Sequence, residues 1–196
     1  MTGIVRALLR DQRGGPVAEF AMVLPAALLL VLGMGDLAYQ AYLESILTGA
    51  VQKAGRDSTI QGAATQTDQI DQKVINAVKS AAPTATFVSS RENYDNYSEI
   101  GPEPFTDTNH NGVRDRGECY SDVNANGQWD SDPGQSGQGG ASDVTYYKMK
   151  ATFPRLFPFA WLVGWSQSVT ITASTILKNQ PYATQTVNTV TTICTP

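Results

Sequence analysis

The feature that most constrains this chain is an apolar stretch near its N-terminus. Phe20 to Gly35 is a run of 16 residues without a charged side chain, and Asp36 follows it directly. As an α-helix rising about 1.5 Å per residue it would be about 24 Å long, a little less than the roughly 30 Å hydrocarbon core of a bilayer. The apolar face continues over residues 37–43 and includes two tyrosines, which favour a membrane interface. The stretch therefore predicts one membrane-spanning helix, within residues 15–60.

Charged residues on either side of this stretch predict its orientation. Three arginines precede it (Arg6, Arg10 and Arg13), whereas Asp36 and Glu44 follow it. Because basic residues are retained on the cytoplasmic side, we expect a single pass with a cytoplasmic N-terminus and an extracytoplasmic C-terminal domain.

Glu19 is a carboxylate at the border of the apolar stretch. An ionisable group inside a membrane is costly and usually functional, with a partner charge, although a place among the lipid headgroups is an alternative interpretation. If the chain is cut between Gly14 and Gly15, Glu19 becomes the fifth residue of the new chain. A carboxylate at that distance can pair with a free amine near the membrane border, so that each charge offsets the desolvation of the other.

These residues resemble the processing site of type IV prepilins, and more closely that of the TadE family of the Tad (Flp-type) pilus system. In that family a short basic leader ends in glycine, and Glu-Phe or Glu-Tyr follows at the fifth and sixth positions; here the pair is Glu19-Phe20. The resemblance implies that residues 1–14 are a leader removed by a prepilin peptidase. The glycine doublet Gly14-Gly15 leaves the position of the cleaved bond ambiguous by one residue. The resemblance also implies that Glu19 pairs with the amine of a neighbouring subunit. The implied partners are other pilin or pseudopilin subunits and the Tad assembly platform, in the bacterial inner membrane or in an extracellular pilus.

The remainder, residues 61–196, predicts a small extracytoplasmic domain of α+β class. The stripe from Ile46 to Ala54 predicts that the first helix continues to about Ser58, packing on its own domain or on a partner. A second amphipathic helix is expected from Thr67 or Asp68 to about Ala82. Alternating or β-rich segments predict a short antiparallel sheet with the helices on one face, from residues 84–90, 143–153 and 166–177, with 186–193 as an edge strand.

The segment between the two alternating strands, residues 154–165, is rich in aromatic residues and contains two prolines. It is too short to span a membrane. Three interpretations stay open: part of the core, a surface for a partner, or an anchor at the membrane interface. Two such strands around an apolar connector also resemble the C-terminal part of the TadE family.

An internal repeat lies within residues 103–133. Each copy contains Asp-x-Asn-x-Asn-Gly-x-x-Asp, at an offset of 15 residues. This is the pattern of a calcium loop, with oxygen ligands at positions 1, 3, 5 and 9, a glycine at position 6 and a backbone carbonyl at position 7. The predicted ligands are Asp107, Asn109, Asn111, Val113, Asp115 and Glu118 (position 12) in the first loop, and Asp122, Asn124, Asn126, Gln128 and Asp130 in the second. The alternative is a cluster of Asn, Gly and Asp turns without a metal.

Neither loop is flanked by the helical pattern of a helix–loop–helix sensor, and this resembles the calcium-stapled repeats of bacterial surface proteins. One or two Ca²⁺ ions are therefore the expected cofactor. Cys119 and Cys194, both outside the cytoplasm in this topology, are expected to form a disulfide, with two free thiols as the alternative.

The composition limits what else the chain can do. The formal net charge is −4, and loss of a leader with three arginines and one aspartate would make it about −6. This argues against nucleic acid, which requires clustered basic residues. The single histidine, His110, lies in a predicted metal loop, so there is no constellation for catalysis and we expect neither an enzyme nor a small-molecule substrate.

Together these patterns predict a minor pilin or pseudopilin of a Tad-type pilus, with a calcium-stabilised ectodomain. Two alternatives stay open. One is a single-pass exported protein with a calcium-binding or adhesive ectodomain and no relation to pili. The other is a secreted protein whose apolar stretch is a signal peptide cut after Gly35, which the long N-terminal region and the apolar face beyond Asp36 disfavour.

Overall fold

A computed structural model describes residues 15–59, 66–157 and 160–194. The chain divides into two compact units. One comprises the chain up to Tyr42 together with Arg155–Gln167, the segment that we call the connector; the other comprises Leu43–Pro154 and Ser168–Pro196. The predicted leader, including Gly14, lies outside the described residues.

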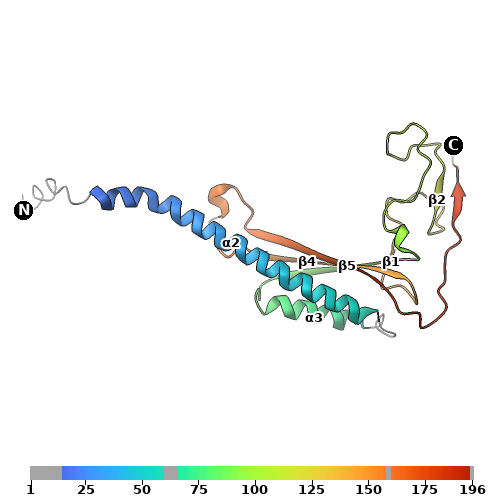
Figure 1. Cartoon of the computed structure of the whole chain (residues 1–196), viewed down its shortest axis with the longest axis horizontal. Coiled ribbons are helices and arrows are strands. Elements are labelled where there is room, and N and C mark those ends of the chain that lie inside the picture. The colour runs from blue at the N-terminus through green and yellow to red at the C-terminus, as the bar shows by residue number, and fades with distance from the viewer. Residues whose placement is uncertain (1–14, 60–65, 158–159, 195–196) are drawn as a thin grey trace, which may run out of the picture. The chain divides into compact units, whose positions relative to one another are not determined.

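The first unit is dominated by the N-terminal part of α2 (Gly15–Ser58), the long helix at the blue end of the chain in Figure 1. This helix is long and apolar enough to cross a membrane, and none of its most apolar 18-residue window is buried within the molecule. Its large apolar side chains, among them Phe20, Met22, Leu30 and Val31, are exposed. A helix that is apolar and yet uncovered by its own chain suggests membrane anchoring.

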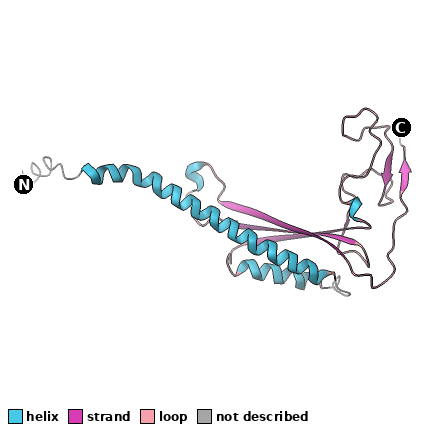
Figure 2. Ribbon diagram, in the orientation of Figure 1, coloured by secondary structure: helices cyan, strands magenta, loops and turns pink. Residues whose placement is uncertain are grey.

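The second unit contains a four-stranded antiparallel sheet in the order β3-β1-β4-β5, whose strands are magenta in Figure 2. Its strands are β1 (Thr86–Tyr94), β3 (Gln135–Ser136), β4 (Val144–Pro154) and β5 (Ser168–Lys178). The last two pair along their whole length, from Val144↔Lys178 to Pro154↔Ser168. With α3 (Thr67–Lys79) and the C-terminal part of α2, this confirms the predicted α+β class.

Both helices cover one face of this sheet because each has an apolar stripe. Among the buried apolar side chains are Leu43, Leu47, Val51 and Ala54 on α2, Ile70, Val74 and Val78 on α3, and Tyr147, Met149, Ala151 and Phe153 on β4. The stripe on α2 therefore packs on its own domain. Gly55 lets α2 approach β5, because a Cβ added there would lie 2.4 Å from Leu177 Cδ1.

One buried ion pair fixes α3 to the sheet. The Arg91 guanidinium donates to both Asp71 oxygens, at 2.5 and 3.1 Å, and the Tyr147 hydroxyl donates to Asp71 Oδ1 at 2.6 Å. Arg91 also lies over the Tyr147 ring, 4.2 Å from its centroid. Burial raises the pKa of Asp71, but hydrogen bonds from Arg91, Tyr147 and Ser89 and the charge of Arg91 outweigh it, so that the pKa lies below its ordinary value.

A second, two-stranded sheet joins β2 (Tyr120–Asp122) to β6 (Thr191–Ile193). The predicted edge strand at residues 186–193 is therefore wrong in both its length and its place: only Thr191–Ile193 is a strand, and it pairs with β2 instead of the main sheet. In Figure 1 the short red strand β6 accordingly lies beside β2. The predicted disulfide is present, joining Cys119 to Cys194 across this small sheet.

Candidate calcium-binding loops

The two copies of the repeat adopt the same backbone conformation. Position 4 has a positive φ in both loops (58° at His110 and 59° at Ala125), and so does the glycine at position 6 (76° at Gly112 and 78° at Gly127). A left-handed backbone at position 6 is why a calcium loop requires glycine there. The repeated sequence thus folds into two repeated turns.

The side chains predicted as ligands converge within each loop. In the first loop, Asp107 Oδ2 accepts a hydrogen bond from the amide of Gly112 at 2.8 Å, and Asp115 Oδ2 accepts one each from the side-chain amides of Asn109 and Asn111 at 2.7 Å. The Asn111 side-chain oxygen accepts from the backbone N–H of Val113, at position 7. Hydrogen bonds therefore join the side chains at positions 3 and 5 to position 9, and the side chain at position 1 to the backbone at position 6.

The second loop repeats these contacts residue for residue. Asp122 Oδ2 accepts from Gly127 N at 2.8 Å, and Asp130 Oδ2 accepts from the side-chain amides of Asn124 at 2.9 Å and Asn126 at 2.5 Å. The Gln128 amide donates to the Asn126 side-chain oxygen at 2.7 Å. Both loops thus present two carboxylates and two carboxamides, a hard-oxygen set that fits Ca²⁺. Within the described parts of the chain, no three His, Cys, Asp or Glu side chains are grouped for a metal.

Glu118 lies beside the first loop and contacts its backbone. Its Oε1 accepts from Thr108 N at 2.7 Å and its Oε2 from Asp115 N at 2.9 Å. The hydrogen bonds from Asp115 and Thr108 hold the pKa of the Glu118 carboxyl below its ordinary value. Both oxygens of this predicted position-12 ligand are thus occupied by amides of the loop.

Glu103 does the same for the second loop, and sequence reasoning missed it. Its Oε1 accepts from Val123 N and its Oε2 from Asp130 N, both at 2.9 Å. Only 1% of Glu103 and 3% of Glu118 is exposed. Each glutamate opens one copy of the repeat but binds the loop of the other copy, so we call this pair the crossed glutamates. The sequence signal that could have identified Glu103 is its alignment with Glu118, since each is the first residue of its copy of the repeat.

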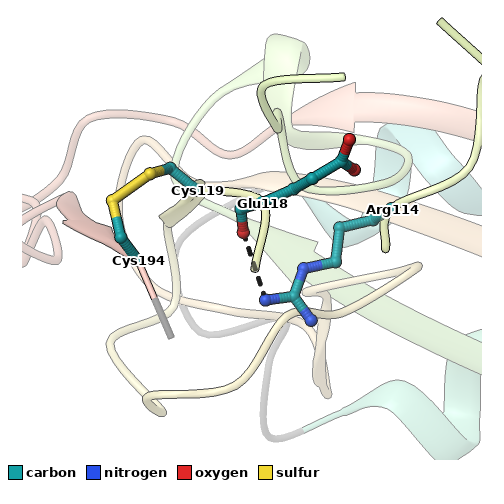
Figure 3. Close-up of a disulfide and its surroundings, with 4 residues drawn as sticks. All are labelled: Arg114, Glu118, Cys119 and Cys194. Carbon is teal, nitrogen blue, oxygen red and sulfur yellow. Dashed lines mark hydrogen bonds between the residues drawn. A yellow bond between two sulfur atoms is a disulfide. The ribbon is translucent and has the colours of Figure 1, made fainter. Parts of the chain in front are cut away.

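Other hydrogen bonds also join one copy of the repeat to the other in equivalent pairs. Thr106 N donates to Cys119 O and Ser121 N donates to Pro104 O, both at 2.8 Å. Arg114 donates to the backbone oxygen of Glu118, as Figure 3 shows, and Trp129 donates to that of Glu103. The insert is therefore a locally two-fold arrangement, with the disulfide directly after one of its crossed glutamates.

The N-terminal motif lies on α2. Gly15 is the first residue of the helix, and the Glu19 and Phe20 side chains are exposed. The model of a family described as TadE-like protein matches residues 17–56, nearly the whole of this helix. Over these residues the chain is similar to the TadE-like family.

The resemblance predicted from Glu19-Phe20 and the apolar run after it is thus confirmed. The matched segment ends at residue 56, well before the two loops, so the match says nothing of them. No curated protein matches the chain, and neither does any solved structure.

Proposed function

We propose that this TadE-like chain is a minor pilin or pseudopilin that takes part in assembly of a Tad-type pilus. The observation that carries the proposal is the family match over α2, which includes Glu19 and an apolar segment of which none is buried within the molecule. In this proposal the helix is held in the bacterial inner membrane, and its role is structural, with no reaction of its own.

The chemistry of the helix start supports a specific assembly contact. A prepilin peptidase would release Gly15 as a new N-terminal amine, four residues before Glu19. The Glu19 carboxylate of one subunit then pairs with the amine of the next, because two opposite charges near hydrocarbon cost less together than apart. The exposed apolar face of α2 supplies the surface for neighbouring helices and lipid.

The test is co-expression with the cognate prepilin peptidase and pilus genes, followed by N-terminal sequencing and pilus purification. The wild-type chain is expected to lose about 14 residues, and Gly14→Ala to reduce that loss. Glu19→Gln is expected to be cleaved and inserted normally but to fail in assembly, because an unpaired buried amine costs about 3–5 kcal/mol. Glu44→Gln, the same change at an exposed position of α2, is the matched control and should assemble normally.

Two outcomes would favour the other functions. An uncut chain that stays in the membrane favours an exported calcium-binding or adhesive protein. Maturation that begins at Asp36 favours a signal peptide and would remove the pilin proposal altogether.

We also propose that each loop of the insert binds one Ca²⁺ ion. The ligands would be the side chains at positions 1, 3, 5 and 9 and the carbonyls of Val113 and Gln128. In this structure the side-chain N–H groups of the two asparagines of each loop donate hydrogen bonds to Asp115 in the first loop and to Asp130 in the second. Turning those carboxamides over would present their oxygens to an ion. In this proposal the crossed glutamates, including Glu118, support the loop backbones.

Calcium is therefore expected to raise the thermal midpoint of the full chain in detergent. At ten times the dissociation constant, linkage gives about 1.4 kcal/mol per site, and extracellular modules bind at about 10⁻⁴–10⁻³ M. Asp107→Asn and Asp122→Asn retain the shape and one of the two acceptor oxygens but remove the charge, so each should lose part of the rise and the double variant all of it. Mg²⁺ at equal concentration controls for charge screening and should have little effect. An identical midpoint in calcium and in chelator would show that the loops are turns without a metal.

A further inference from the structure

The connector is held to α2 by a buried charge. Asp36 is only 5% exposed, on a helix whose neighbouring apolar residues face outward. Its carboxylate forms an ion pair with Arg155 and accepts hydrogen bonds from Leu156 N at 3.0 Å and Gln40 Nε2 at 2.8 Å. Arg155 is the only charged residue among residues 155–167. The connector therefore has one ionic attachment point, at the last turn of the apolar run.

Further contacts close the connector on itself and bring it close to the helix. Arg155 N donates to Gln167 O at 3.0 Å, and Arg155 Nε donates to Ser166 O at 2.7 Å. The Phe157 ring lies against Gly35, where an added Cβ would be 3.3 Å from Phe157 Cε2. These contacts hold the two ends of the connector together and fix it at one position on α2.

Four of the connector's large apolar side chains are exposed. Leu156 is 51% exposed, Trp161 64%, Leu162 52% and Trp165 50%, and Trp161 and Leu162 lie on the short helix η4 (Ala160–Val163), drawn in orange in Figure 1. Arg155 lies over the Trp165 ring, 5.1 Å from its centroid. An exposed group of two tryptophans and two leucines is large for a surface that faces only water.

We propose that this group inserts into the lipid interface on the outer side of the membrane that α2 spans. The inference rests on the proposed membrane helix. The connector is attached to α2 at Gly35 and Asp36, where the charge-free run ends. Its exposed side chains therefore extend the lipid-exposed surface of the helix. Tryptophan prefers the headgroup level, and a paired Asp36 and Arg155 can enter that region at a much lower cost than either charge alone. The connector would thus set the depth of the helix and resist its movement along the membrane normal.

The test is depth-dependent quenching in vesicles of phosphatidylcholine and phosphatidylglycerol, with lipids that carry a quencher near the headgroup or near the acyl end. A full-length chain with Trp129→Phe and Trp165→Phe leaves Trp161 as the reporter. Its fluorescence is expected to fall several-fold with the shallow quencher and much less with the deep one. The control chain with Trp161→Phe and Trp165→Phe reports on Trp129 in the insert and should respond to neither lipid.

Asp36→Asn in the Trp161 reporter should abolish the preference for the shallow quencher, whereas Glu44→Gln should leave it unchanged. Retained shallow quenching in Asp36→Asn would overturn the role of the ion pair. A Trp161 that aqueous iodide quenches instead would show a solvated connector. A Trp161 that no quencher reaches would show that protein, from this chain or a second copy, covers it. Either result overturns the proposal. Retention of the protein in the same vesicles after alkaline extraction measures insertion of α2 separately. A protein that is extracted would contradict the membrane helix, and with it the pilin proposal, whatever the quenching result.

Discussion

Asp71→Asn is expected to lower the free energy of unfolding of the second unit by about 3–5 kcal/mol, because it leaves the Arg91 guanidinium buried without a counter-charge. The Asp71 and Arg91 side chains are 12% and 8% exposed, so solvent screens this pair little. Denaturant unfolding of the full chain in detergent would measure the loss. The matched control is Asp57→Asn, whose partner Lys73 lies 3.4 Å away on the protein surface, and it should cost less than about 1 kcal/mol.

The same pair makes a prediction about pH. Because the folded-state pKa of Asp71 lies below the ordinary value of 3.8, the ion pair contributes its stability above that value and loses it as the pH falls through the folded pKa. The difference in stability between wild type and Asp71→Asn should therefore be constant near neutrality and shrink below about pH 4. A difference that stays constant into stronger acid would contradict the assignment.

Replacing both cysteines with serine is expected to cost about 4 kcal/mol, because the disulfide closes a loop between residues that are 75 positions apart. Loss of the bridge frees the C-terminal strand β6 from β2 and removes a constraint next to Glu118. Thermal unfolding with and without reductant measures the effect, and reduced wild type should match the double variant. An unchanged midpoint in reductant would mean that hydrogen bonds of the β2–β6 pair hold this region without the bridge.

The sequence predicted best those elements whose pattern is set by one buried face. The three-and-four spacing from Ile46 to Ala54 predicted that α2 continues to about Ser58, where it ends. Strict alternation predicted β4 and β5 to within two residues, because the helices cover one face of both strands. A periodic pattern indicates which face of an element is buried, so the element can be predicted without knowing what packs against it.

Partners distant in sequence were predicted less well. The Thr-rich C-terminal segment has strand propensity, but propensity does not specify which sheet it joins, and β6 was assigned to the wrong one. Asp36 was recognised only as the end of an apolar run, since its partner Arg155 lies 119 residues further along the chain. In the candidate site, the ligand positions followed from the nine-residue pattern, whereas the crossed glutamates depend on how the two copies face each other.

That exchange of glutamates makes the insert indivisible. Each copy of the repeat supplies the glutamate carboxylate that binds the loop of the other copy, so the two copies depend on each other. Excision of either copy would remove one loop and also strip the surviving loop of its buried acceptor for two backbone amides. The two copies are therefore expected to be retained or lost together, which sets them apart from open-ended repeats that lengthen one unit at a time.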